Sequence, residues 1–436
     1  MTEPHKKQKI GLWTSTSLVV GNMIGAGVFL TPAAMASFGS VSLLGWAMAA
    51  IGSFFVAKVF SNLSKLLPRA TGGPYAYSRH GLGDFAGFLI AWGYFIANAC
   101  ALAAIVVSFI SAMSTFFPLL NQSPFAAVSI ALITIWLLTY INSLGIVASG
   151  VMQLITTVLK LAPLILIAIV GLFYIKAKNF LPFNSSGVSL TSAISTTAAM
   201  AMFSFVGFES ATVPAGDVEN PGATVSKATM LGLFISTAVF ILGSVSIMGI
   251  IPAKILAVSP TPYSDAADII FGHGARYLVS AGMAVAAFGA INGWTLIQGQ
   301  APMATAKDKL LPPVFAWLNK NGVPWFGMVI SSALVSCFIS MNYTHGLVDK
   351  FRQLLLLAVL TTLVPYLFSV AAYPIIRAKE KRTTGWTAAV ILAVVAFIYT
   401  LWEIAGSGED AVYYGFVLMM MGIPFYVWLA YKKHHE

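Results

Sequence analysis

The sequence predicts an all-α membrane protein that crosses the bilayer many times. Only 9% of its 436 residues are charged, whereas 58% are hydrophobic. A soluble globular chain carries about 25% charged residues, which coat the surface that faces water. In addition, apolar runs recur along the whole chain at about 20 residues, the length that a helix needs to cross the hydrocarbon core. We therefore expect a polytopic helical bundle rather than a soluble domain.

The apolar runs define twelve expected transmembrane helices. Short segments of alternating hydrophobicity, which are typical of a membrane β-barrel, are not apparent in the sequence. The expected spans are centred on residues 11–36, 41–66, 84–112, 125–143, 151–175, 192–213, 228–251, 277–303, 324–341, 350–375, 384–405 and 411–431.

Basic residues gather on one side of these expected spans. If the N-terminus is cytoplasmic, seventeen of the 24 Lys and Arg residues fall in cytoplasmic segments, and Lys160 lies within a span. Cytoplasmic loops of membrane proteins carry such an excess. We therefore expect a multi-pass protein of the cytoplasmic (inner) membrane with both termini in the cytoplasm. The formal net charge of +10 then reflects topology, and no nucleic-acid partner is expected.

Glycine-rich interruptions occur in the first and the sixth expected span. The first contains GNMIGAG at 21–27, and the sixth contains FSFVGFES at 203–210. Glycine accommodates non-helical backbone, which is tolerated at membrane depth only where it is buried in protein or lines a cavity. Close packing of helices is the alternative role for such glycines. Interruptions at matching places in two halves favour a transporter substrate site.

The two interruptions correspond if the first ten spans form two repeats of five. We therefore interpret residues 1–436 as one transporter domain, with five-helix repeats at 11–175 and 192–375 and two additional helices at 384–431.

Broken helices supply backbone groups for both ends of an amino acid. A half-helix that begins near Ala26 and Gly27 would present free N–H groups and a positive dipole end to a carboxylate. Unpaired carbonyls around Met23, Phe203 and Val206 would suit an ammonium group. The sequence therefore predicts a receptor for the α-amino and α-carboxyl groups of an amino acid.

Several segments together resemble the amino acid–polyamine–organocation transporters. They are GNMIGAGVF at 21–29, GGPYAYSRHG at 72–81, FSFVGFES at 203–210, DVENP at 217–221, NGW at 292–294 and LVPY at 363–366. The resemblance is nearest to basic amino acid and polyamine antiporters such as the arginine/agmatine exchanger. It implies inverted repeats of five helices, discontinuous helices one and six, two C-terminal helices, a setting in membrane lipid and often a homodimer.

The resemblance also implies roles for individual side chains. Glu209 matches an acid used in substrate and proton coupling, and Trp294 matches an aromatic residue that stacks on the substrate. Tyr75 and Tyr94 match gating aromatics. The substrate-binding set that we expect is Met23, Ile24, Gly25, Ala26, Gly27, Ala97, Asn98, Leu102, Phe203, Val206, Trp294 and Ala358.

The sequence departs from the arginine/agmatine exchanger at five of these positions, namely Ala26, Asn98, Leu102, Phe203 and Ala358. The polar groups that recognise a guanidinium group are mostly missing as a result. A smaller or less polar amino acid is therefore expected to fit the changed pocket better.

Lys160 and Glu209 stand out as charged residues deep in expected spans. A charge at the bilayer centre costs about 2.5–3.5 kcal/mol on insertion scales, so it is normally functional or paired. Snorkelling of Lys160 and structural hydrogen bonding of Glu209 are the alternatives. We assign both residues to coupling. The resemblance implies that Lys160 replaces the positive charge of a sodium ion near the first helix, which argues against sodium dependence.

These features predict a secondary active amino acid transporter that works by alternating access, either by exchange or by proton-coupled uptake. A cationic amino acid or polyamine antiporter is the alternative. An ion channel is a remote one, because channels favour pore-lining rings repeated across subunits. An enzyme, a metal site and a cofactor are not expected, since the histidines fall in loops or tails and the sequence has no HExxH, paired-cysteine or Walker A motif.

Overall fold

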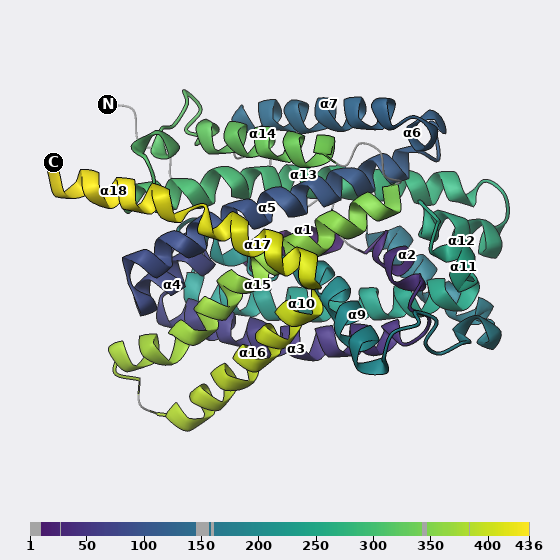
Figure 1. Cartoon of the computed structure of the whole chain (residues 1–436), viewed down its shortest axis with the longest axis horizontal. Coiled ribbons are helices and arrows are strands. Elements are labelled where there is room, and N and C mark those ends of the chain that lie inside the picture. The colour runs from purple at the N-terminus through teal and green to yellow at the C-terminus, as the bar shows by residue number, and fades with distance from the viewer. Residues whose placement is uncertain are drawn as a thin grey trace.

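We describe a computed structural model of the chain over residues 10–26, 28–144, 157, 161–341, 347–382 and 384–435 (Figure 1). Secondary structure within these residues is helical, apart from one isolated parallel bridge between Ile10 and Val218. In the same part of the chain, eight helices are long and apolar enough to cross a membrane. The predicted all-α, multi-spanning fold class is confirmed.

The first span is divided into two helices. α1 (Leu12–Ala26) contains non-helical backbone at Ile24, with φ −84° and ψ 26°, and α2 (Thr31–Ala36) begins after a turn at 28–30. Pro32 stands in the first turn of α2, where the missing amide hydrogen of proline costs no helical hydrogen bond. The predicted discontinuity of this span is therefore present.

The next spans of the first half are continuous helices joined by short ones. The spans are α3 (Ser42–Leu66), α5 (Asp84–Met113) and α7 (Pro124–Ser143), and the connecting helices are α4 (Pro74–Leu82) and α6 (Leu119–Gln122).

The fifth span is described in part. Its apolar helical segment Leu161–Tyr174 ends in the 3₁₀ helix η1 (Gly171–Tyr174), and η2 (Ala177–Phe180) follows. Lys160 lies outside the described residues. Thr157 is described, and its hydroxyl donates to the carbonyl of Ser17 on α1 at 3.4 Å.

The sixth span is also broken. α9 (Leu190–Phe205) ends before Gly207, and the chain continues through the short 3₁₀ helices η3 (Ser210–Thr212) and η4 (Ala215–Asp217). The second half of this span therefore consists of 3₁₀ turns rather than a second α-helix.

The loop after this break is paired with the start of the chain. The amide of Ile10 donates to the carbonyl of Asp217 at 2.9 Å, and the amide of Glu219 donates to the carbonyl of Ile10 at 2.9 Å. These two bonds form the parallel bridge between Ile10 and Val218, which fixes the entry to α1 beside the exit from η4.

The second half supplies the remaining spans. They are α10 (Pro221–Ile250), α13 (Ala275–Lys307), α14 (Trp325–Met341), α15 (Leu347–Lys379) and α16 (Trp386–Gly406), with α11 (Ala253–Leu256), α12 (Pro262–Phe271) and η5 (Pro313–Ala316) between them. α10 begins at Pro221 rather than near 228, because its first turns are polar and an apolar run cannot mark them. The twelfth span is divided into α17 (Glu409–Met420) and α18 (Ile423–His435).

The helices pack so that the broken spans lie at the centre. α1 lies against α10 and α13, α5 lies against α13 and α15, and α3 lies against α9 and α10. α7 and α14 pack together at one edge of the molecule, while α16 and α17 lie along α15 (Figure 1). One apolar core runs through these helices and includes the residues around both breaks.

Candidate functional site

The two predicted interruptions contact each other. Gly207 has φ +113°, and a Cβ at this position would lie 3.2 Å from the Cβ of Asn22 and 3.2 Å from the amide nitrogen of Met23. Only glycine combines this backbone conformation with so close an approach. The side-chain amide of Asn22 also donates to the hydroxyl of Ser210 at 2.9 Å. The breaks of the first and sixth spans therefore form one joint structure in the centre of the protein.

The first break has a second role in helix packing. A Cβ at Gly25 would overlap the Cβ of Ala290, so Gly25 lets α1 approach α13 closely. This is the alternative role considered for the glycines. Gly27 and the side chain of Ala26 lie outside what the structure describes.

The new helix begins at Thr31 rather than near Ala26 and Gly27, where a half-helix is expected from the sequence. The carbonyl of Leu30 accepts a hydrogen bond from the amide of Ala34 at 2.9 Å, and Pro32 stands in the first turn. These residues therefore set the start of the helix. The free N–H groups of this half-helix therefore lie beyond the predicted position.

The carbonyls of the sixth-span break differ in their availability. The carbonyl of Phe203, which is predicted to be free, accepts the amide of Val206 at 3.2 Å and helps to close α9. The carbonyl of Val206 accepts no backbone hydrogen bond from a described residue. Val206 is therefore the better candidate acceptor for an ammonium group.

Glu209 lies beside the break with its side chain fully buried. Its Oε1 accepts from the hydroxyl of Tyr94 at 3.0 Å, and its Oε2 accepts from the amide of Gly207 at 3.0 Å and from the hydroxyl of Tyr366. Three donors suit an ionised carboxylate, since hydrogen bonds compensate part of the cost of burying charge. Tyr94 and Tyr366 thereby connect α5 and α15 to the broken span.

Tyr366 is absent from the predicted site set, although it lies in the LVPY segment that carries part of the resemblance. A tyrosine in an apolar run gives no sign of its partner, and Tyr366 and Glu209 are far apart in the chain. Its role follows only from the way α15 packs beside the break.

The other predicted side chains come from several helices. Met23 and Ile24 lie on α1, and the remaining residues are Ala97, Asn98 and Leu102 on α5, Phe203 and Val206 at the end of α9, Trp294 on α13 and Ala358 on α15. All of these side chains are buried. The predicted site is therefore closed to water in this conformation.

Three buried polar atoms of the first break and the predicted binding set lack a hydrogen-bond partner among the described residues. They are the indole Nε1 of Trp294 and Nδ2 of Asn98, which are donors, and Oδ1 of Asn22, which is an acceptor. An unsatisfied buried group costs about 1–3 kcal/mol. A donor and an acceptor of this kind match a molecule that carries both a carboxylate and an ammonium group.

Tyr75, the second predicted gating residue, belongs to a different cluster. Its hydroxyl donates to Oδ2 of Asp308 at 2.7 Å, and Arg79 pairs with Asp308 at 2.6 Å and with Asp84 at 2.9 Å. We call these four residues the α4–α13 latch, because they join α4 and the start of α5 to the end of α13. Burial, followed by the bond to Asp308, raises the pKa of Tyr75 well above its ordinary value, so Tyr75 stays a neutral donor.

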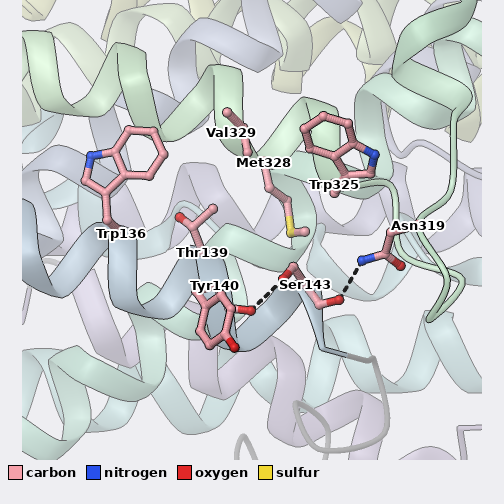
Figure 2. Close-up of a pocket in the computed structure, with 8 residues that line it drawn as sticks. All are labelled: Trp136, Thr139, Tyr140, Ser143, Asn319, Trp325, Met328 and Val329. Carbon is pink, nitrogen blue, oxygen red and sulfur yellow. Dashed lines mark hydrogen bonds between the residues drawn. The ribbon is translucent and has the colours of Figure 1, made fainter.

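A cavity of about 380 Å³ lies between α7 and α14, away from the predicted site (Figure 2). Its lining contains none of the predicted site residues. Trp136 and Trp325 stand at its two ends, and the side-chain amide of Asn319 donates to the carbonyl of Ser143 in its wall. Partly exposed tryptophans of this kind are typical of the membrane interface.

Comparison with known proteins agrees with a helical membrane protein that crosses the bilayer many times. The sequence profile described as amino acid permease matches residues 10–431. The chain is 32% identical to a cadaverine/lysine antiporter of Escherichia coli strain K12, over 98% of this chain and 96% of the relative. It is 29% identical to an arginine/agmatine antiporter of Chlamydia pneumoniae, over 99% of this chain and 93% of the relative. It is 30% identical to an arginine/ornithine antiporter of Pseudomonas aeruginosa, over 93% of this chain and 87% of the relative.

These matches span nearly the whole chain and include both interruptions and the residues around them. They agree with the resemblance that the short motifs carry, and they place the protein among transporters rather than enzymes. The chain belongs to the amino acid permease family, within the amino acid–polyamine–organocation transporters.

Proposed function

We propose that the protein is a sodium-independent antiporter that exchanges a cationic amino acid for a related amine or amino acid. The observation that carries this proposal is the contact between the two helix breaks beside the buried carboxylate of Glu209. Broken helices at matching positions supply the backbone groups that bind transported solutes. The relatives are named as antiporters of lysine, arginine, ornithine and their amines, which supports the cationic substrate class.

In this proposal the amino acid binds to the two breaks by its α-groups. Its ammonium group binds the carbonyl of Val206 and Oδ1 of Asn22, while its carboxylate accepts from backbone N–H groups and from Trp294. A cationic side chain then lies among aromatic faces, which attract cations by about 0.5–2 kcal/mol. Phe203 and Trp294 are the buried aromatics of the predicted set that can act in this way.

Glu209 connects binding to the conformational change. Both of its oxygens already accept hydrogen bonds from α5, α15 and its own segment. A cation or a proton that competes for this carboxylate would weaken the bonds from Tyr94 and Tyr366, and would thereby free the broken span to move. We assign Glu209 to coupling for this reason, with Tyr94 as its gating partner.

The α4–α13 latch would close the cytoplasmic side. The excess of basic residues predicts cytoplasmic termini, so α4, between the second and third spans, lies on that side. Alternating access then requires the latch to open when the cytoplasmic side opens. We therefore extend the gating role of Tyr75 to Arg79, Asp84 and Asp308.

Lys160 is proposed to carry the positive charge that makes sodium unnecessary. It lies outside the described residues. Thr157, three residues earlier in the sequence, donates to the carbonyl of Ser17 at 3.4 Å, so Thr157 lies beside α1.

The wider organisation is part of the proposal. Residues 1–436 form one domain with repeats at 11–175 and 192–375 and added helices at 384–431. The protein lies in the inner membrane with both termini in the cytoplasm, in contact with membrane lipid and as a homodimer. The exposed apolar side chains of α16 and α17, such as Ile398 and Phe416, suit contact with lipid or with a second copy.

A small neutral amino acid is the second candidate substrate. The observation that favours it is the apolar lining by Ala97, Leu102 and Ala358, all of which are buried. Because a guanidinium or ammonium side chain needs polar partners, this lining would exclude cationic side chains if they pointed toward it.

Counterflow in proteoliposomes tests the proposal. Vesicles are loaded with lysine, arginine, ornithine, their decarboxylated amines, alanine or leucine, and uptake of the same labelled compounds is measured in sodium and in choline buffer. We expect uptake only into vesicles loaded with a cationic partner, at equal rates in both buffers. Protein-free vesicles are the control.

Other outcomes of this experiment would contradict specific parts of the proposal. Exchange of alanine or leucine alone would favour the second candidate. Uptake into empty vesicles would reject antiport, and a requirement for sodium would reject the role of Lys160. A thermal-shift panel of the same compounds tests recognition of both α-groups, which stabilisation by the amines alone would rule out.

A further inference from the structure

A second buried carboxylate lies outside the predicted site. Glu403 on α16 is 0% exposed, near the end of a span that the sequence marks as apolar. The hydroxyl of Tyr399, one turn earlier, donates to Oε1 of Glu403 at 2.8 Å. Oε2 has no hydrogen-bond partner among the described residues, and Glu403 forms no ion pair within the described part of the chain.

Glu403 lies where α16 packs tightly against α3 and α9. A Cβ at Gly52 of α3 would overlap the ring of Tyr399, and a Cβ at Gly406 would lie 2.5 Å from the carbonyl of Ser195 on α9. The Tyr399 hydroxyl is also 3.4 Å from the carbonyl of Ala49 on α3. These close approaches exclude water from the carboxyl group.

The groups that face Glu403 supply no compensating charge. α9 carries no titratable residue, and the titratable group that bonds to Glu403 is Tyr399 on α16 itself. On the other packed helices, Tyr366 bonds to Glu209. The charged side chains that the structure describes there form no ion pair with Glu403; they are Lys58 and Lys65 on α3, Asp349, Arg352, Arg377 and Lys379 on α15, and Glu409 and Asp410 on α17.

A comparison with Glu209 indicates the protonation state of Glu403. Glu209 receives three hydrogen bonds, which compensate much of the cost of burying a charge there. Glu403 receives one, although it is equally buried. An ion that is buried with an unpaired oxygen costs far more than a neutral polar group in the same place. The neutral, protonated form of Glu403 is therefore favoured in this conformation.

We propose that Glu403 is a proton-binding site of the transport cycle, separate from the substrate site. α9 runs from Ser195, which lies against Gly406 of α16, to the break beside Glu209, so a movement of the broken span changes the packing around both carboxylates. When α3 and α9 lie against α16, water is excluded from the carboxyl group of Glu403, and the group keeps its proton. When they move away, water reaches the group, its O–H bond ionises and the proton passes to water.

This inference rests on the proposed function only because it takes α9 to move during transport. Glu403→Gln replaces the carboxylic acid by a neutral group of the same shape, and Glu409→Gln on the exposed start of α17 is the matched control. Counterflow, its pH profile and proton flux into vesicles loaded with a pH-sensitive dye are measured for each protein.

We expect Glu403→Gln to keep counterflow at acidic pH within about twofold of the unchanged protein. Its pH profile flattens to less than half of the normal change, and its proton flux is lost, while Glu409→Gln behaves normally. A normal pH profile and proton flux in Glu403→Gln would overturn the proposal. Failure of the proposed function would instead appear as absent exchange in the unchanged protein.

Infrared spectroscopy tests the bound proton without transport. The unchanged protein at neutral pH is expected to show the carbonyl stretch of a protonated carboxylic acid, and this band disappears in Glu403→Gln. If Glu403→Gln does not fold, Tyr399→Phe identifies the band, because loss of its hydrogen bond moves the stretch to higher frequency. Absence of the band, or a band that neither change affects, would reject the proton site.

Discussion

Glu209 shows how one side chain can hold a broken helix in place. Its donors come from Tyr94 on α5, Tyr366 on α15 and the amide of Gly207 in the break itself. Hydrogen bonds to a charged group contribute about 1.5–3 kcal/mol each. Movement of the break relative to α5 and α15 must therefore exchange these bonds for others, which supports the coupling role that we propose for Glu209.

Glu209→Gln should lower the initial rate of counterflow at least tenfold, a change of about 1.4 kcal/mol in the barrier. Glutamine keeps the size of the side chain, but its NH₂ group donates hydrogen bonds and cannot accept them. It therefore cannot replace both carboxylate oxygens as acceptors for the three donors. The rate is measured in proteoliposomes with equal amounts of protein, across a range of pH. Glu219→Gln, at an exposed position after the same span, is the control. A full rate with unchanged pH dependence in Glu209→Gln would remove Glu209 from coupling.

The sequence identified Glu209 correctly as a buried charge beside a break, but it did not identify Glu403. Both are single acids in apolar surroundings. Glu209 follows a glycine interruption, which marks it, whereas Glu403 lies near the end of an ordinary apolar run. Its burial depends on how closely Gly52 and Gly406 bring three helices together, and such contacts leave no local pattern.

At the scale of the helices, the position of the breaks depends on glycine. Gly207 lies in the left-handed region, where a side chain costs about 1–2 kcal/mol, and it also faces the backbone of α1. Gly187 has φ +76°, and a Cβ added there would have no atom within 4 Å, so it shares the conformation without the contact. A comparison of Gly207 with Gly187 therefore separates the cost of backbone strain from the cost of disturbing the contact with α1.

Gly207→Ala is expected to destabilise the protein by about 2–4 kcal/mol, because strain and overpacking add. Gly187→Ala should destabilise the protein only by the backbone strain. Thermal unfolding in detergent measures both, and the shift produced by substrate reports whether the breaks still bind. Equal effects of the two changes would show that the contact between Gly207 and α1 is unimportant.

The existence of the helices could be predicted better than their ends. Apolar runs of membrane length marked the spans, because burial in lipid requires them. They did not reveal that the first span resumes at Thr31, nor that the sixth continues as 3₁₀ turns. Hydrogen bonds decide those boundaries, and similar apolar residues lie on both sides of them.

At the scale of the whole molecule, the α4–α13 latch joins segments that are far apart in the chain. Asp308 meets Tyr75 and Arg79 across more than half of the sequence, so no local motif could have revealed the pairing. The side chains of Arg79 and Asp308 are partly exposed, and such ion pairs contribute about 0.2–1 kcal/mol each. The latch is therefore weak enough to open during a transport cycle.

Asp308→Asn should raise hydrogen–deuterium exchange severalfold in α4 and at the end of α13, because about 1 kcal/mol of latch stability corresponds to roughly a fivefold change in opening. Asp265→Asn is the control, since it breaks the pairing with Arg276 within the α12–α13 connection. Its effect should remain at that end of α13. Unchanged exchange around α4 in Asp308→Asn would show that the latch does not hold this side closed.

The bridge between Ile10 and Val218 has a consequence for the whole cycle. It joins the residue that leads into α1 to the loop that leaves the sixth span, on the far side of the contact between Gly207 and Asn22. The part of α1 up to Asn22 and the 3₁₀ segment that follows Gly207 are thus joined at two separate points. A solute that displaces either break is therefore expected to move these two segments together.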